Sequence, residues 1–156
     1  MLNINKASQY GLRAVIYLSN PKIRYTTSSI QYIAKREEIP VAYLRKLVVD
    51  LKRAGIVRTI QGQYGGIQLA KDPAAISVLD ILNAAGEEVQ LNECVPKPFV
   101  CKQSKGCSIR PIWVEVTFSL RDYFDSTSIA DVLEQQELCE KESSRETNSK
   151  NYAINE

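Results

Sequence analysis

Residues 39–69 read IPVAYLRKLVVDLKRAGIVRTIQGQYGGIQL and contain two different hydrophobic periods. Between residues 43 and 51 the apolar side chains recur at the three- and four-residue spacing of an amphipathic helix, and Gly55 stands where a helix commonly ends. The run 56–60 is rich in β-branched residues, and a glycine-rich turn separates it from the short run 67–69. This order predicts a helix followed directly by a small β-hairpin.

Two further helix patterns precede this stretch. Residues 7–18 have one apolar face, which Pro21 ends, and Ser28 with Gln31 has the spacing of a capping box before a second short helix. A tight turn at 39–40 then leads into the helix already described. Two helices joined in this way, followed by a hairpin, predict a mainly α fold: a winged helix-turn-helix with a small β-hairpin wing.

The rest of the chain divides by pattern into three parts. Residues 1–86 complete the predicted DNA-binding domain, since a short helix ends near Gly86. Periodicity then disappears over 87–107, which predicts a cysteine-rich loop. It returns over 108–137, which predicts a long helix and a last short helix that starts at Ser128, and the apolar face of the long helix could bury a partner chain. Residues 138–156 are polar and aperiodic, and we expect them to form a disordered tail.

Composition narrows the possible functions. The 156-residue chain has a net charge of only +2, but residues 1–75 contain 12 basic and 4 acidic side chains, against 8 and 14 in the remainder. A basic N-terminal half favours a polyanionic partner such as double-stranded DNA. The absence of histidine excludes Ser-His and Cys-His nucleophile pairs, so we do not expect an enzyme. No apolar run is long enough to span a membrane, and we expect a cytoplasmic protein.

Polar side chains on the third helix and the hairpin are the candidate DNA contacts. A recognition helix meets base edges near its start, and a wing lies over the minor groove. Arg and Lys can donate to guanine edges or to phosphates, although each alone could equally be part of a solvated helix face. The helix contributes Ala42, Tyr43, Arg45, Lys46 and Arg53, with Lys52 beside them, and the hairpin contributes Arg58, Gln61, Gln63 and Tyr64.

Three of the four cysteines lie in the predicted loop. Six residues separate Cys94 from Cys101, and five separate Cys101 from Cys107, whereas Cys139 stands alone near the tail. Structural zinc sites usually use ligand pairs two to four residues apart, so the wider spacing favours an iron-sulfur cluster over zinc. Free thiols without a metal remain the alternative.

In this order and spacing the motifs resemble the IscR/NsrR/CymR family of bacterial winged-helix transcription regulators. The resemblance runs from Met1 to about Gln136. It rests on YGLRAV at 10–15, IPVAYLRKL at 39–47, GQYGG at 62–66 with LAKDP at 69–73, and the three loop cysteines before Trp113.

The resemblance implies a homodimer that binds a palindromic operator and whose DNA affinity is controlled by an iron-sulfur cluster on Cys94, Cys101 and Cys107. We expect [2Fe-2S] rather than [4Fe-4S], sensing iron, oxygen, nitric oxide or redox state. The alternative is a cluster-free regulator that responds to a metabolite, a partner protein or thiol oxidation.

The sequence also departs from the family pattern. IscR-like members have a histidine where this chain has Arg110, which cannot ligate iron in its charged state. NsrR-like members use an aspartate from the partner's first helix, and the matching residue is Gln9. The candidate fourth ligands are therefore Gln9 of the partner subunit, Glu93, a water molecule or a small thiol. Gln61 stands where many members have a wing arginine.

Overall fold

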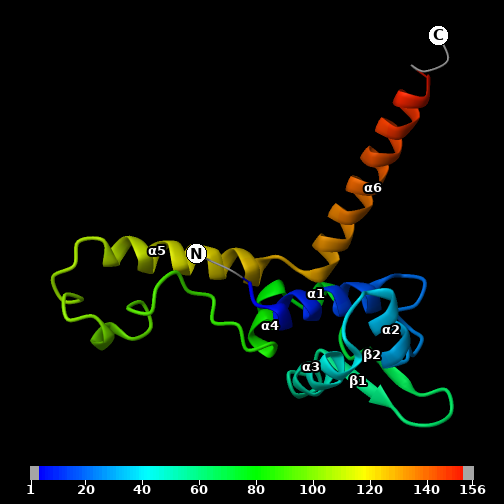
Figure 1. Cartoon of the computed structure of the whole chain (residues 1–156), viewed down its shortest axis with the longest axis horizontal. Coiled ribbons are helices and arrows are strands. Elements are labelled where there is room, and N and C mark those ends of the chain that lie inside the picture. Colours follow the sequence, from blue (N-terminus) through cyan, green and yellow to red (C-terminus); the bar gives the residue numbers. More distant parts are fainter. Residues whose placement is uncertain (1–3, 153–156) are drawn as a thin grey trace.

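The computed structural model describes the backbone of residues 4–152 and the side chains through Cys139 and of Lys141. It is a mainly helical chain with one two-stranded antiparallel sheet, as predicted (Figure 1). The elements in chain order are α1 (Lys6–Ser19), α2 (Ile30–Arg36), α3 (Val41–Arg53), β1 (Val57–Ile60), β2 (Gly66–Leu69), η1 (Pro73–Ala75), α4 (Val78–Ala84), η2 (Pro98–Val100), α5 (Arg110–Ser126) and α6 (Ile129–Tyr152). No helix within this part of the chain is long and apolar enough to cross a membrane.

The main core lies inside the winged helix. Apolar side chains at helical spacing on α1, α2 and α3 meet the inward side chains of the hairpin, and Ile129 from the start of α6 joins them. Burying one such Leu or Ile side chain contributes about 1.5–3 kcal/mol. The most completely buried members include Val15, Ile33, Leu44, Leu51, Ile67 and Ile129.

Most helix ends agree with the sequence, and the exceptions are the start of α2 and the end of α6. Gly55 and Gly86 have the positive φ expected after a helix, and Ser77 forms a complete capping box with Asp80. The capping box predicted at Ser28 is wrong, because the hydroxyl of Ser29 caps α2 instead.

Ser28 is unavailable as a cap because its backbone pairs with the second strand. The N–H of Ser28 donates to the carbonyl of Ile67 at 3.0 Å, and the N–H of Ile67 donates to the carbonyl of Ser28 at 2.9 Å. This bridge explains Gly66: a Cβ there would lie 2.4 Å from the carbonyl oxygen of Ser28. Gly62, with a φ of 117°, supplies the left-handed residue of the turn.

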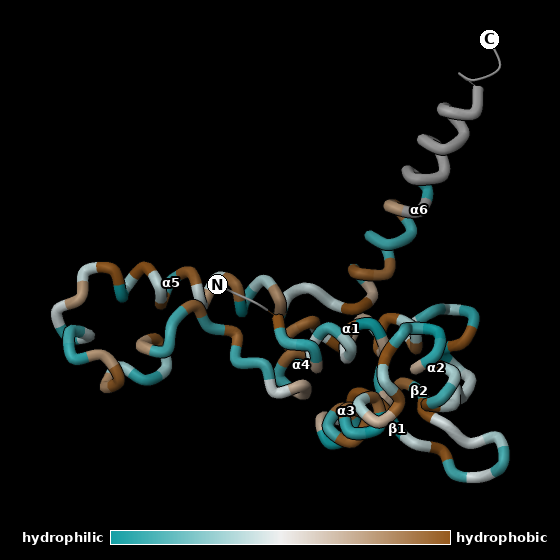
Figure 2. The backbone as a smooth tube through the Cα atoms, viewed as in Figure 1, coloured by the Kyte–Doolittle hydropathy of each residue, from teal (hydrophilic) through white to brown (hydrophobic). Residues whose placement is uncertain are grey.

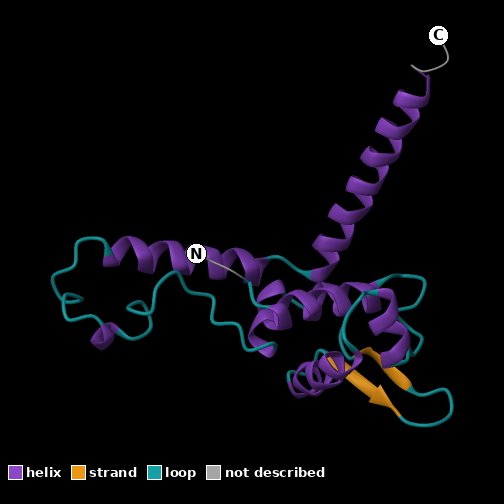
Figure 3. Cartoon of the chain, viewed as in Figure 1, coloured by secondary structure: helices purple, strands orange, loops and turns teal. Residues whose placement is uncertain are grey.

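The second half of the chain extends away from the winged helix. α5 packs against α4 near its C-terminal end, through Leu120 and Phe124 against Leu79 and Leu82. Figure 1 shows the other end of α5 reaching far from the winged helix, and Figure 3 shows residues 87–109 beside it as an irregular loop interrupted only by η2. Figure 2 shows hydrophobic segments along α5.

The disordered tail predicted from residue 138 is corrected by the structure, since α6 continues to Tyr152. Residues 129–152 contain neither Gly nor Pro, and Glu137 forms an i,i+4 ion pair with Lys141 at 3.9 Å. Helix propensity and such pairs support a helix that has little apolar face beyond its first turns. Residues 153–156 of the predicted tail lie outside the described residues.

Candidate nucleic-acid interface and cysteine loop

One face of α3 is buried in the core, and the other face is exposed to solvent. Because Leu44, Leu47 and Leu51 point into the core, the polar residues between them face solvent. All five predicted contact residues of this helix are exposed: Ala42, Tyr43, Arg45, Lys46 and Arg53.

These side chains differ in how far they are free to bind a ligand. The ring of Tyr43 packs edge-on against Tyr10 of α1, with centroids 5.4 Å apart, so α1 fixes its orientation. Arg53 pairs with Asp50 at 3.1 Å, which partly neutralises its charge. Arg45 and Lys46 form no ion pair or side-chain hydrogen bond with any described residue. Among the predicted contacts of α3 they are therefore the cations without a competing carboxylate in the described part of the chain.

The hairpin presents a second exposed surface beside α3 (Figure 1). Arg58, Gln61, Gln63 and Tyr64 are all exposed, and Tyr64 at the turn is 87% accessible. Lys52 Nζ donates to Thr59 Oγ1 at 3.0 Å, which ties β1 to the last turn of α3. The structure therefore brings the helix and hairpin candidates to adjoining elements, with Lys52 serving as a link between them.

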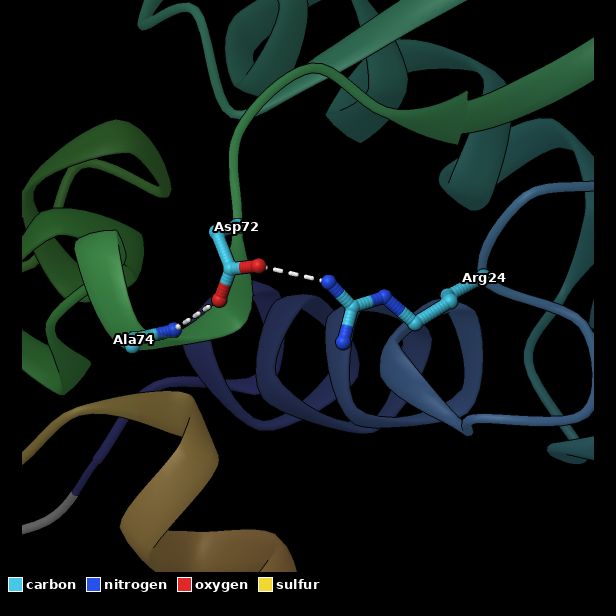
Figure 4. A network of polar contacts seen from close by, with 3 residues as sticks. All are labelled: Arg24, Asp72 and Ala74. Atoms are coloured by element: carbon cyan, nitrogen blue, oxygen red, sulfur yellow. Dashed lines mark hydrogen bonds and ion pairs between the residues drawn. The ribbon is translucent and has the colours of Figure 1, made fainter.

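Two contacts that sequence reasoning missed anchor the hairpin to the α1–α2 connection. Thr27 Oγ1 donates to the carbonyl of Tyr64 at 2.8 Å, and Arg24 donates to Asp72 at 2.5 Å just after β2 (Figure 4). The N–H of Ala74 and, after it, the guanidinium of Arg24 hold the pKa of Asp72 below its usual 3.8. No local pattern could have indicated these contacts, since the partners are 37 and 48 residues apart.

The loop cysteines do not converge in this conformation. Cys101 is exposed, Cys94 and Cys107 are half-buried, and all are free thiols. Among the described side chains, no group of three His, Cys, Asp or Glu residues lies close enough to hold a metal ion. The residue types suit an iron-sulfur cluster, but the loop as it stands does not form a cluster site.

Two charged residues attach the loop to the neighbouring helices. Glu87 Oε2 accepts from the backbone N–H of Asn5 at 2.7 Å and from Ser8 Oγ at 3.0 Å, which joins the loop to the start of α1. Arg110 Nε and Nη2 donate to the carbonyls of Cys94 and Val95 at 3.0 and 3.3 Å. Sequence reasoning identified Arg110 only as a departure from the family, and missed that it joins the first cysteine to α5.

Gln9, which the sequence made a candidate fourth ligand of the cluster in the partner subunit, lies on α1. Its Nε2 donates to the carbonyl of Ile4 at 2.7 Å, so within its own chain the amide nitrogen helps hold the residues before the helix. The carboxamide oxygen is the atom that could act as a metal ligand.

Comparison with known proteins supports the same architecture. The sequence model of the Rrf2 family, described as "Iron-dependent Transcriptional regulator", matches residues 4–135. Protein rrf2 of Nitratidesulfovibrio vulgaris is 30% identical over 140 residues, which cover 90% of this chain and 93% of that protein.

Solved structures with similar folds include the global cysteine regulator CymR of B. subtilis, at 28% identity and a TM-score of 0.69, covering 86% of this chain and 98% of that one. T. potens IscR has 27% identity and a TM-score of 0.67, covering 86% and 88%. With the family match spanning the winged helix, the loop and α5, the chain belongs to the Rrf2 family of transcriptional regulators.

Proposed function

We propose that α3 reads base edges in the major groove of promoter DNA while the hairpin lies over the adjacent minor groove. The observation that carries this proposal is the pair of unpaired cations Arg45 and Lys46 on the exposed face of α3, beside a wing that Lys52 ties to the same helix. Guanidinium and ammonium groups in such a position donate to guanine edges and phosphates. Ala42, Tyr43, Arg53, Arg58, Gln61, Gln63 and Tyr64 complete the proposed contact set.

The proposed DNA-binding unit is a homodimer on a palindromic operator. α5 exposes an apolar stripe in which Ile112 and Val116 are 49% and 45% accessible, one turn apart. Burying such a stripe against a second copy would place two recognition helices on successive half-sites.

The cysteine loop is the proposed sensory element. Cys94, Cys101 and Cys107 would hold an iron-sulfur cluster, [2Fe-2S] in preference to [4Fe-4S], which would supply a redox- and iron-sensitive group. Because these thiols do not form a metal-binding group in the described conformation, cluster binding requires the loop to rearrange. Gln9 of the partner subunit stays the proposed fourth ligand. Arg110 is held by carbonyl groups and is charged, which makes it unsuitable as a ligand.

The dispersed thiols also favour a second candidate, a cluster-free regulator that responds to thiol oxidation or to a small ligand. Cys101 is exposed in the loop and open to an oxidant. The two candidates share the DNA-binding surface and differ only in the signal that acts on the loop.

DNA binding is tested by fluorescence anisotropy with the DNA upstream of the protein's own gene and with a shuffled sequence of equal length. Arg45→Ala should weaken binding to the specific DNA about 5- to 150-fold, which corresponds to about 1–3 kcal/mol of lost base contact. Lys141→Ala removes one positive charge from α6 and serves as the control. Equal losses in both variants, or equal affinity for both DNAs, would contradict the proposed contact surface.

The sensory proposal is tested by the visible spectrum, iron content and sulfide content of protein purified without oxygen. Broad visible bands with matching iron and sulfide, lost in Cys94→Ala, Cys101→Ala and Cys107→Ala but retained in Cys139→Ser, would support the cluster. Colourless protein after reconstitution would exclude it. DNA binding that responds to peroxide in such protein would support the cluster-free candidate.

A further inference from the structure

A hollow of about 480 Å³ lies between residues 89–96 of the cysteine loop and α5. This volume is in the range of sites for small organic ligands. The wall is mostly apolar, with polar groups at a few points. The lining residues are Val89, Gln90, Val95, Pro96, Arg110, Val114, Thr117, Phe118 and Arg121.

The charge of this hollow is unbalanced. Arg110 and Arg121 are both half-buried, the lining contains no acidic residue, and neither arginine forms an ion pair with a carboxylate of the described chain. The imbalance is notable because residues 76–156 carry 14 acidic side chains against 8 basic ones. Guanidinium groups partly removed from water without a counter-ion favour an incoming anion.

Arg110 is already oriented for such a ligand. Its Nε and Nη2 donate to the carbonyls of Cys94 and Val95, which fixes the plane of the guanidinium. A guanidinium carries five N–H donors, so these two bonds leave others available. A carboxylate matches this planar fork because it can accept two parallel hydrogen bonds.

The hollow lies apart from the stripe assigned to dimerisation. At 3.6 residues per turn, Arg110, Val114 and Arg121 lie on one face of α5. Ile112 and Val116 lie on roughly the opposite face, and Ile109 and Tyr123 continue that exposed stripe. A second copy packed against the stripe would therefore leave the hollow open.

We propose that this hollow binds a small carboxylate with an apolar body, whose charged end contacts Arg110 and Arg121 and whose body packs on Val95, Val114 and Phe118. Arg110, which would hold the ligand, also donates a hydrogen bond to the carbonyl of Cys94, the first loop cysteine. The ligand's influence on the loop rests on the proposed sensory function, whereas binding itself does not.

The test is calorimetric titration of the full chain, without DNA, using octanoate as the probe and octanol and octylamine as neutral and cationic probes of equal length. We expect saturable octanoate binding at one site per chain, with octanol at least tenfold weaker and octylamine weaker still. Arg121→Gln and Val114→Asp should each weaken octanoate binding about tenfold or more, while Arg36→Gln on α2 should leave it unchanged.

Arg121→Lys keeps the positive charge at this position, and we expect it to bind octanoate more tightly than Arg121→Gln. This comparison distinguishes an effect of the lost charge from an effect of the altered side chain on folding. Equal affinity for octanoate and octanol, or undiminished binding by Arg121→Gln, would overturn the proposal. Binding by a dissociated monomer but not by the dimer would also overturn it, because the second copy would then cover the hollow. Since no DNA is present, these results do not depend on whether α3 binds an operator.

Discussion

At the scale of single residues, Gly66 shows how one missing side chain permits a long-range contact. The carbonyl oxygen of Ser28 approaches the Cα of Gly66 so closely that a Cβ would lie 2.4 Å from it. Strand pairing between Ser28 and Ile67 therefore depends on glycine at this position, and the pairing joins the α1–α2 connection to the base of the wing.

We predict that Gly66→Ala destabilises the fold by about 1–3 kcal/mol, the usual range for forcing an extra carbon into a packed site. Urea unfolding followed by circular dichroism would measure the change. Gly106→Ala is the matched control, because a Cβ there meets no atom within 4 Å. A loss of equal size in both variants would show that the contact with Ser28 is not responsible, because removing glycine's freedom in the unfolded chain by itself stabilises the fold.

Asp72 is a single residue whose ionisation makes the stability of the fold depend on pH. Its pKa in the folded chain is below the ordinary 3.8, first because the N–H of Ala74 donates to it and second because Arg24 does. A carboxyl whose pKa is lower when folded contributes stability above its unfolded pKa, and loses that contribution as the pH falls through the folded value.

We predict that Asp72→Asn is less stable than the unmodified chain above about pH 4, where an unfolded aspartate is ionised, and that the difference shrinks as the pH falls further. Urea midpoints of both proteins from neutral to acidic pH would test this. A stability difference that stays constant across the range would mean that the ionised form has no preferential contacts.

At the scale of elements, α5 performs two tasks with two faces. One face packs on α4 and lines the hollow beside the loop, and the other exposes an apolar stripe that includes Ile112 and Val116. A helix with apolar residues on both sides requires partners on both sides.

We predict that Ile112→Asp weakens self-association at least tenfold, since burying an unpaired carboxylate in an apolar interface is costly. Sedimentation of the variant over a range of concentrations would show the shift toward monomer. Glu115→Gln, an exposed neighbour on the same helix, should sediment like the unmodified chain. If both variants behave alike, the dimer uses another surface.

The elements also show where sequence patterns succeed. α3 and the hairpin were predicted within a residue or two, because their apolar spacing and β-branched residues express the local burial directly. The sequence did not predict that α6 continues beyond residue 137, because the helices were recognised by the regular spacing of apolar residues. This part of α6 consists of helix-forming residues with little apolar face. The cap of α2 was misplaced by one residue because Ser28 has a strand partner 39 positions away.

At the scale of the whole molecule, the charge of the chain is divided between its two halves. The basic half contains the winged helix, with 12 Lys and Arg against 4 Asp and Glu in residues 1–75, and the acidic half contains the loop, α5 and α6. This division favours an orientation in which α3 and the wing approach DNA and the acidic half stays away from the phosphates.

We predict that the affinity for operator DNA falls steeply with salt, and that Lys46→Ala reduces the slope of log affinity against log salt concentration by about 1, as expected for one lost phosphate contact. Anisotropy titrations over a series of salt concentrations would measure both slopes. An unchanged slope would assign Lys46 to base contacts or to no contact with DNA.

The sequence by itself determined the winged helix, the exposed candidates on α3 and the hairpin, and the presence of three thiols in an irregular loop. These features follow from spacings of two to four residues, which chain geometry converts into faces and turns. Tertiary structure alone decided that Thr27 holds Tyr64, that Arg110 holds the carbonyl of Cys94, and that the three thiols do not converge in this conformation. Such contacts join residues many positions apart, so they depend on how the elements pack and not on any local pattern.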